Sequence, residues 1–310
     1  MKNCIVTTTI FKPSLALKKF SELKDWTLIV VGDLKTPQHL YKKLNNVIYL
    51  SPLDQEKISK KLSNLIGWNC IQRRNFGYIF AKFNGAKVVA SVDDDNIPYS
   101  DWGKKIFLNK KINVNYFNIR DEVFDPLSIF KFKEKIWHRG YPINLLQKRA
   151  KAVKNSKIIK ADIQANLWDA CPDIDAINRI GLKKEDNFYF PKVTPYSSNK
   201  YSPFNSQNTI FTIDVLKNYF LFPFVGRMDD IWASYYVQSL GFKVVFCDAT
   251  VFQKRNQHVY YNDFKNELIG YVNNLDLVKS LYQNPRNIKT FLPKRSYLAF
   301  KEYQKIMKTN

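Results

Sequence analysis

The chain lacks the features that mark several common protein classes. Its four cysteines, Cys4, Cys70, Cys171 and Cys247, lie far apart and form no Cys-x-x-Cys pair, which indicates buried thiols in a reducing compartment. No apolar run approaches the length of a transmembrane helix. Residues 5–11 are too short and too interrupted by threonines for a signal peptide. We therefore expect a cytosolic (cytoplasmic) protein, or one bound to a membrane surface from the cytosolic side.

Acidic residues are scarce compared with basic ones. The 310 residues include 27 Asp and Glu against 49 Lys and Arg, a formal net charge of +22. Such a surface attracts phosphates, anionic lipid or nucleic acid, and the charge alone does not choose among them. No zinc-finger spacing, RNP-like motif or helix-turn-helix pattern is present, so we expect no nucleic-acid partner.

Three consecutive aspartates, Asp93, Asp94 and Asp95, follow an apolar run at residues 86–92. The run is short and β-rich, and it predicts a buried parallel strand. Ligands of open α/β sheets bind beyond the carboxyl ends of such strands, and clustered carboxylates suit Mg²⁺ or Mn²⁺ shared with substrate phosphates. Asp93 and Asp95 point the same way along an extended segment, whereas Asp94 faces the sheet or a sugar. The alternative is a solvated acidic turn.

The first half of the chain alternates between strand and helix patterns. This alternation predicts a mainly parallel sheet covered by helices, with strands at residues 4–10, 26–31, 47–50 and 86–92 and helices at 14–23, from 51, and at 71–83.

The second half is less regular. Residues 120–172 hold few clean periods, and residues 188–208 predict a long loop over a site. The remaining predicted elements are strands at 210–213 and 243–247, a helix at 229–240 and helical segments from 275. The simplest division is an α/β catalytic domain at residues 1–270 and a basic helical extension at 271–310.

Short motifs along the chain resemble the STELLO-like glycosyltransferase family. They follow one another between about residues 5 and 265, at 32–37, 73–78, 85–87, 93–96, 173–176, 203–209 and 229–232. A shorter resemblance, at residues 124–126 and 139–142, is to reversibly glycosylated polypeptides, the plant UDP-arabinopyranose mutases. Both resemblances imply a GT-A (Rossmann-like) nucleotide-sugar-binding domain with a DxD metal motif.

The resemblance implies a metal-dependent transfer of sugar from a nucleotide donor, most simply a UDP-sugar, to a glycan or lipid-linked acceptor. Asp33 would contact the nucleotide, although a solvated turn acid is the alternative. Arg73 or Arg74 would reach the diphosphate or the DxD acids, since arginine binds phosphate in a bidentate way; the alternative is a surface pair.

Two acids, Asp229 and Asp230, begin a predicted helix, where the helix dipole favours negative charge. In GT-A enzymes an acid at this position often takes the proton of the attacking hydroxyl. We expect Asp230 to be the base, because Asp229 can serve as the helix cap. His258 follows the last strand, where such enzymes often supply a third metal ligand; a surface or packing histidine is the alternative.

In the reversibly glycosylated polypeptides, the arginine that matches Arg139 carries the sugar. Arginine stays protonated in proteins and is a poor nucleophile. We therefore expect Arg139 to support donor binding by holding a phosphate or an acid. A nucleotide-sugar mutase or self-glycosylating protein remains an alternative function, as does a non-catalytic basic binding module.

The C-terminal segment mixes basic and apolar side chains. It predicts either an amphipathic helix on an anionic membrane surface or a helix packed on the catalytic domain. The basic residues are Lys289, Lys294, Arg295, Lys301, Lys305 and Lys308.

Overall fold

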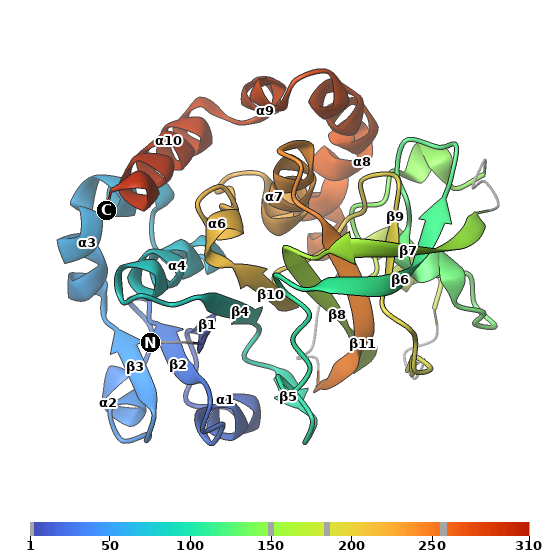
Figure 1. Cartoon of the computed structure of the whole chain (residues 1–310). Helices are drawn as coiled ribbons and strands as arrows, with labels where there is room; N and C mark the ends of the chain where they lie inside the picture. Colours follow the sequence, from blue (N-terminus) through green and yellow to red (C-terminus); the bar gives the residue numbers. More distant parts are fainter. Residues whose placement is uncertain (1–2, 148–151, 183–186, 255–258, 310) are drawn as a thin grey trace.

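The computed structural model describes residues 3–147, 152–182, 187–254 and 259–309. These residues form one mixed sheet of eleven strands with helices on both sides (Figure 1). Alternate strand residues point to opposite faces, so the sheet has two cores. Val6 and Val31 pack with helices α4 and α7 on one face, whereas Ile5 and Val30 pack with α1 on the other.

The N-terminal half matches its predicted order closely. The four strands lie in the order β3-β2-β1-β4 and are parallel: β1 Asn3–Thr8, β2 Thr27–Val31, β3 Val47–Leu50 and β4 Val88–Val92. The helices are α1 Leu15–Ser21, α2 Gln38–Tyr41, α3 Pro52–Ile66 and α4 Arg74–Phe83, the last preceded by the 3₁₀ turn η1 Ile71–Arg73.

Local chemistry explains these boundaries. The Ser14 side chain accepts a hydrogen bond from the Leu17 amide and caps α1. Ser51 and Asp54 form a reciprocal capping box at the start of α3. Gly77 allows α4 to approach β1, because a Cβ there would lie 2.3 Å from Cγ1 of Val6.

The second half of the sheet corrects the expectation of a mainly parallel sheet. Half of the strand pairings between described residues are antiparallel, and the arrangement is a mixed α/β one consistent with a Rossmann-like fold. Its strands are β5 Asn96–Pro98, β6 Lys111–Asn118, β7 Val153–Lys160, β8 Ile163–Ala170, β9 Tyr196–Ser198, β10 Asn208–Thr212 and β11 Val244–Gln253.

The sequence did not predict strand β8, because polar residues interrupt its apolar pattern. All eight of its residues are buried, yet they include Gln164, Asn166 and Asp169. The Gln164 amide donates to the Lys105 carbonyl and to Oδ1 of Asn166, both at 3.0 Å. Because these partners satisfy the polar atoms internally, the sequence shows no apolar run at this central strand.

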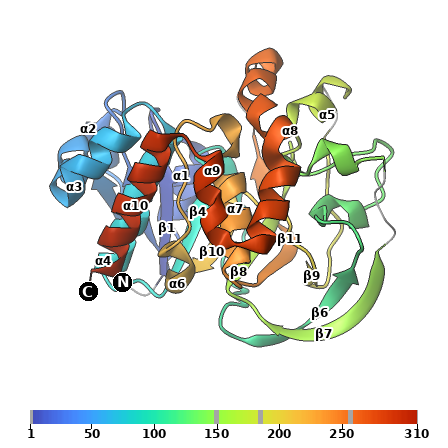
Figure 2. The same ribbon diagram turned by 90° about the horizontal axis from the view of Figure 1, so that it is seen from above.

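The remaining helices cover one side of the molecule (Figure 2). They are α5 Ala176–Ile180, α6 Ile213–Leu216, α7 Asp229–Ser239, α8 Tyr260–Gln283, α9 Ile288–Phe291 and α10 Lys294–Lys308, with 3₁₀ turns at Pro126–Ile129, Ile143–Leu145, Gly226–Met228 (η4) and Pro285–Asn287. Helix α8 runs unbroken across residues 270 and 271. No helix within the described ranges has the length and apolar character needed to cross a membrane.

The C-terminal helix α10 packs on the rest of the chain, against α3 and α4. Its apolar side chains Ala299, Phe300, Tyr303 and Met307 are buried, and the Tyr303 hydroxyl donates to the Leu216 carbonyl at 2.6 Å. The apolar face that a membrane-bound helix would insert is thus already covered by protein.

Candidate active site

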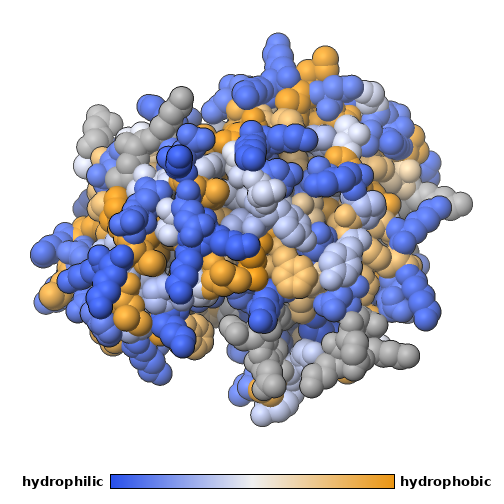
Figure 3. All heavy atoms as spheres, turned by 90° about the horizontal axis from the view of Figure 1, so that it is seen from below, coloured by the Kyte–Doolittle hydropathy of each residue, from blue (hydrophilic) through white to orange (hydrophobic). Residues whose placement is uncertain are grey.

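A cavity of about 210 Å³ opens where β4, the segment before β10 and the start of α7 meet. The face of the molecule seen from below mixes hydrophilic side chains with small hydrophobic patches (Figure 3). The lining residues are largely polar or charged: Ile71, Asp93, Asp95, Arg139, Asp173, Ser206, Gln207, Gly226, Arg227, Asp229, Asp230 and Gln253.

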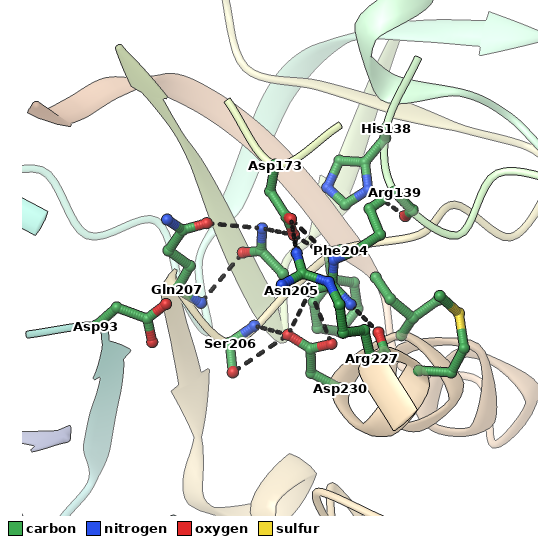
Figure 4. A network of polar contacts seen from close by, with 12 residues as sticks. Asp93, His138, Arg139, Asp173, Phe204, Asn205, Ser206, Gln207, Arg227 and Asp230 are labelled. Atoms are coloured by element: carbon green, nitrogen blue, oxygen red, sulfur yellow. Dashed lines mark hydrogen bonds and ion pairs between the residues drawn. The ribbon is translucent and has the colours of Figure 1, made fainter. Parts of the chain in front are cut away.

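Arg139 lies at the centre of one wall of this cavity (Figure 4). Its Nε donates to both carboxylate oxygens of Asp173 at 2.8 Å, and its Nη2 donates to both oxygens of Asp230 at 3.1 Å. Its Nη1 donates to the Arg227 carbonyl. Gly140, at a φ of +85°, sets this segment against α7, since a Cβ there would lie 2.3 Å from Ile231. Arg139 therefore ties two acids together and keeps no guanidinium nitrogen free.

A second arginine, Arg227, extends the network to helix α8. It contacts Asp173 at 3.4 Å, Asp263 at 3.2 Å and Glu267 at 2.8 Å. Although burial opposes ionisation, Arg139 and then Arg227 hold the pKa of Asp173 well below its ordinary range. This wall of the cavity is thus an ion-pair network in which two arginines hold four acidic side chains.

Asp229 lies beside this network without joining it. Among the described residues it forms no ion pair, and Gln72 donates to its Oδ2 at 2.8 Å. Burial, followed by repulsion from Asp230, raises the Asp229 pKa to about 7. The cap residue of α7 is Met228, and Asp229 is the first helical residue. The reason for preferring Asp230 as the base, that Asp229 caps the helix, is therefore wrong.

The strand-end acids form the opposite wall. Asp93 Oδ1 pairs with Nη2 of Arg74 at 2.7 Å, and the fully buried Arg74 also donates to the Ser206 carbonyl at 3.0 Å. Asp95 lines the same cavity, with Nε2 of Gln253 at 3.5 Å. Asp93 and Asp95 share one cavity as expected, but residues 93–96 form a turn and not an extended segment, since the Asn96 amide donates to the Asp93 carbonyl at 3.3 Å. Arg74 reaches Asp93, one of the strand-end acids, as the sequence suggested.

Asp94 points to a neighbouring pocket of about 210 Å³, which it lines together with Asp33. Thr9 donates its hydroxyl to Asp94 at 2.5 Å. The Asp33 carboxylate accepts from the amides of Leu34 at 2.7 Å and Cys70 at 3.2 Å. Ile71 lines both pockets, so the two adjoin.

The structure does not bring Arg73 to either pocket. Its side chain is fully buried and lies 3.6 Å from the centre of the Trp68 ring, and its Nε donates to Gln55 at 2.8 Å. Arg73 thus secures the packing between α3 and η1. His258 lies outside the described residues.

A divalent cation fits this site only with help from a ligand. In the part of the chain that the structure covers, no three His, Cys, Asp or Glu side chains are grouped to hold a metal. Asp93 and Asp95 nevertheless present two carboxylates to one cavity. Mg²⁺ is often held by one or two carboxylates when substrate phosphates complete its shell.

Several functional candidates were not assigned a role from sequence. Asp173, Ser206 and Gln207 fall in the family-like motifs, which is the signal that identifies them. Ser206 donates its amide to Asp230 at 2.9 Å. Arg227 and Gln253 carry no comparable signal, because only the folded chain brings them to the cavity.

Comparison with known proteins shows a distant glycosyltransferase-like relationship. The chain is 23% identical over 202 residues to probable glycosyltransferase STELLO1 of Arabidopsis thaliana, covering 61% of this chain and 24% of that protein. It is also 23% identical over 185 residues to STELLO2 of the same plant, covering 56% and 24%. The chain thus spans about a quarter of the length of these relatives.

Other comparisons add little. No family model matches the chain. A solved structure, A197 from STIV, aligns with a TM-score of 0.36 and 9% identity, over 83% of this chain and 87% of its own, a likeness too low to bear on the fold. The resemblance to reversibly glycosylated polypeptides gains no support from these matches.

Proposed function

We propose that this chain is a metal-dependent glycosyltransferase of the GT-A type that moves a sugar from a UDP-sugar to a glycan or lipid-linked acceptor. One observation carries the proposal: the strand-end acids Asp93 and Asp95 share a cavity with a buried carboxyl, Asp229, whose pKa is raised. Acids that can hold a divalent cation against the donor phosphates, opposite a proton acceptor, suit sugar transfer from a nucleotide. The distant STELLO relatives support the same class of reaction.

The two adjoining pockets suit the two parts of a donor. The nucleoside would lie against Asp33 and Asp94, and the diphosphate would lie at Asp93 and Asp95. A Mg²⁺ or Mn²⁺ ion held by these two acids would neutralise the charge that develops on the departing diphosphate. Arg74 holds Asp93 in position from beneath, at 2.7 Å.

Asp229 is the group we assign to the acceptor. A carboxyl whose pKa lies near neutrality takes up a proton efficiently as a bond forms. It would accept the proton of the attacking hydroxyl while the new glycosidic C–O bond forms, the bond from the sugar to the phosphate breaks, and the nucleoside diphosphate leaves. Asp230 is the poorer candidate, because Arg139 and Ser206 already engage its carboxylate.

The bonding of Arg139 argues against the mutase-like alternative. Covalent attachment of a sugar needs a neutral, accessible guanidine nitrogen, whereas Arg139 is 6% exposed and its three guanidinium nitrogens are engaged. Of the two expected roles, holding a phosphate or holding an acid, its contacts support the second, because Arg139 positions Asp173 and Asp230.

The test has two steps. A thermal shift with UDP and Mn²⁺ should raise the melting temperature, because a ligand that binds the native state stabilises it. Incubation with a panel of nucleotide sugars, Mn²⁺ and candidate glycan or lipid acceptors, read by mass spectrometry, should give a sugar-bearing acceptor. A stable hexose or pentose adduct on the wild-type chain that is absent from Arg139→Ala would instead favour the mutase-like function. No shift with any nucleotide would favour a non-catalytic binding module.

A further inference from the structure

Strands β6 and β7 form an antiparallel pair joined by a long connection, which we call the β6–β7 hairpin, and the pair and its flanks carry a concentration of positive charge. Residues 103–118 and 152–161 include seven lysines and no acidic residue. All seven are exposed, and none forms an ion pair with a residue that the structure describes. They are Lys104, Lys105, Lys110, Lys111, Lys154, Lys157 and Lys160.

The hairpin is placed to use this charge outside the molecule. β7 is the terminal strand of the sheet, and Figures 1 and 2 show the hairpin at the end of the molecule away from α10. One face of the hairpin packs inward through Val114 and Ile159. The register places Lys111 opposite Lys160 and Ile158 opposite Asn113 on the other face, where all four are exposed. Farther along this face Phe117 packs against Phe124 and Tyr196 and leaves its partner Lys154 exposed.

An apolar side chain accompanies the lysines. Ile158, on the edge strand β7, is 67% exposed and lies on the same face as Lys154 and Lys160. An exposed β-branched residue flanked by lysines on one face suits an interface with charged headgroups and acyl chains. Single-stranded nucleic acid would call for exposed aromatic rings, and here the Tyr116 ring is covered by Lys157 at 4.2 Å.

We propose that the outer face of the β6–β7 hairpin, which we call the hairpin face (Lys111, Lys154, Ile158 and Lys160), binds anionic lipid surfaces. Each lysine near such a surface multiplies the membrane partition coefficient by a factor of up to about five. The binding weakens with ionic strength, because salt screens exposed charges. This surface is independent of the cavity and of the reaction proposed for it.

Flotation of the full chain with vesicles tests the inference. The vesicles are phosphatidylcholine alone, or phosphatidylcholine mixed with phosphatidylserine. Wild type should float only with the mixed vesicles and detach at high salt. The variant K111Q/K154Q/K160Q should bind on the order of 100-fold more weakly. The control K294Q/K301Q/K305Q removes the same charge from exposed positions on α10 and should bind as wild type does.

Melting temperature and UDP binding should match wild type in both triple variants, since the substituted side chains are exposed. Three outcomes overturn the proposal: no binding of wild type to the mixed vesicles, equal binding of wild type and the hairpin variant, or loss of binding in the α10 control alone. Binding to an oligonucleotide at equal phosphate concentration without binding to vesicles would overturn it in favour of a nucleic-acid surface.

Discussion

The two walls of the cavity treat their acids differently. On the α7 wall, Asp173 and Asp230 share Arg139, and Arg227 adds Asp263 and Glu267, so carboxylates and guanidinium groups satisfy one another. On the β4 wall, Asp93 has a single arginine partner, Arg74, and Asp95 faces the same cavity. On the α7 wall the acids are bound to arginines in one network, which we call the closed network. On the β4 wall the acids have fewer partners and can contact a ligand in the cavity.

This difference separates acids that are held by arginines from acids that have fewer partners and face the cavity. A closed ion-pair network fixes geometry and has little capacity left for a ligand. Asp229 is the exception on the α7 wall, because it sits next to the network and outside it. Asp229 and Asp230 are neighbours in one sequence motif, yet their partners differ. The partners of each carboxyl in the folded chain are therefore a better guide to its function than its place in the motif.

The largest expected effect comes from opening the closed network. Arg139→Ala would leave Asp173 and Asp230 buried without their shared cation, and such uncompensated buried charges cost about 3–5 kcal/mol of unfolding free energy. Urea denaturation measures the loss. Arg139→Lys is the matched control and should lose less unfolding free energy, because lysine keeps the positive charge although it lacks the planar guanidinium that binds two carboxylates at once. A midpoint unchanged in Arg139→Ala would mean that the network does not stabilise the fold.

The next effect distinguishes Asp229 from its neighbour. Asp229→Asn should lower transfer on the order of 100-fold or more, the scale of a lost general base, while donor binding stays close to wild type. Asp230→Asn should mainly weaken the fold, since it removes a partner of Arg139. The measurements are initial rates, the Kd for UDP with Mn²⁺, and the melting temperature. The reverse pattern, with Asp230→Asn stable and inactive, would return the base to Asp230.

On the β4 wall, the two strand-end acids should respond unequally. Asp95→Asn should abolish metal-dependent UDP binding and leave stability close to wild type. Asp93→Asn should lose the same binding and also about 1–3 kcal/mol of unfolding free energy, because it deprives the buried Arg74 of its charged partner. Titration calorimetry and urea denaturation check the pair. Metal-dependent binding that persists in both variants would remove the DxD acids from the donor site.

A smaller effect is the pH dependence of stability. The folded-state pKa of Asp229 lies above its unfolded value, so the unfolded chain releases this proton first as pH rises. The stability of wild type relative to Asp229→Asn should be greatest below about pH 4, fall as pH rises to about 7 and then stay level. Urea denaturation of both proteins across that range gives the difference. A difference that grows in favour of wild type with rising pH would mean that Asp229 is stabilised as the anion.

The smallest effect tests the contact that Gln72 makes with Asp229. The Gln72 amide favours the charged carboxylate, so Gln72→Leu should raise the Asp229 pKa further. The activity should then require a higher pH, with the maximal rate little changed. Gln72→Glu should raise the Asp229 pKa as well, because the new carboxylate would also repel the charged form of Asp229. A pH profile that does not move in Gln72→Leu would separate Asp229 from the rate.

The sequence reveals the parallel half of the sheet because local signals there agree with tertiary structure. Caps such as Ser14 and Ser51 and the apolar strands β1 to β4 are visible without knowledge of the fold. The mixed half depends on partners far along the chain, as when Gln164 is satisfied by the Lys105 carbonyl. The same contrast holds at the candidate site. Asp93 and Asp229 could be proposed from sequence because each belongs to a local pattern, a strand end and a helix start.

Arg139 and Arg227 acquire their roles only from contacts across 34 to 91 positions of sequence. Arg73 shows the opposite error. Its local pattern matched that of Arg74, and folding turned it toward Trp68.

Helix α8 has a consequence for how the molecule can be divided. Its 24 residues span about 36 Å as a single rod. Near one end of the helix, Glu267 forms an ion pair with Arg227. Farther along, Asn274 accepts a hydrogen bond from the Trp232 indole at 2.8 Å and donates one to the Gly140 carbonyl at 3.0 Å. A chain cut at residue 270 would keep the Glu267 ion pair and lose the hydrogen bonds of Asn274. The C-terminal half of α8 thus supports the segment that carries Arg139, and the residues that line the cavity depend on a helix that crosses residue 270.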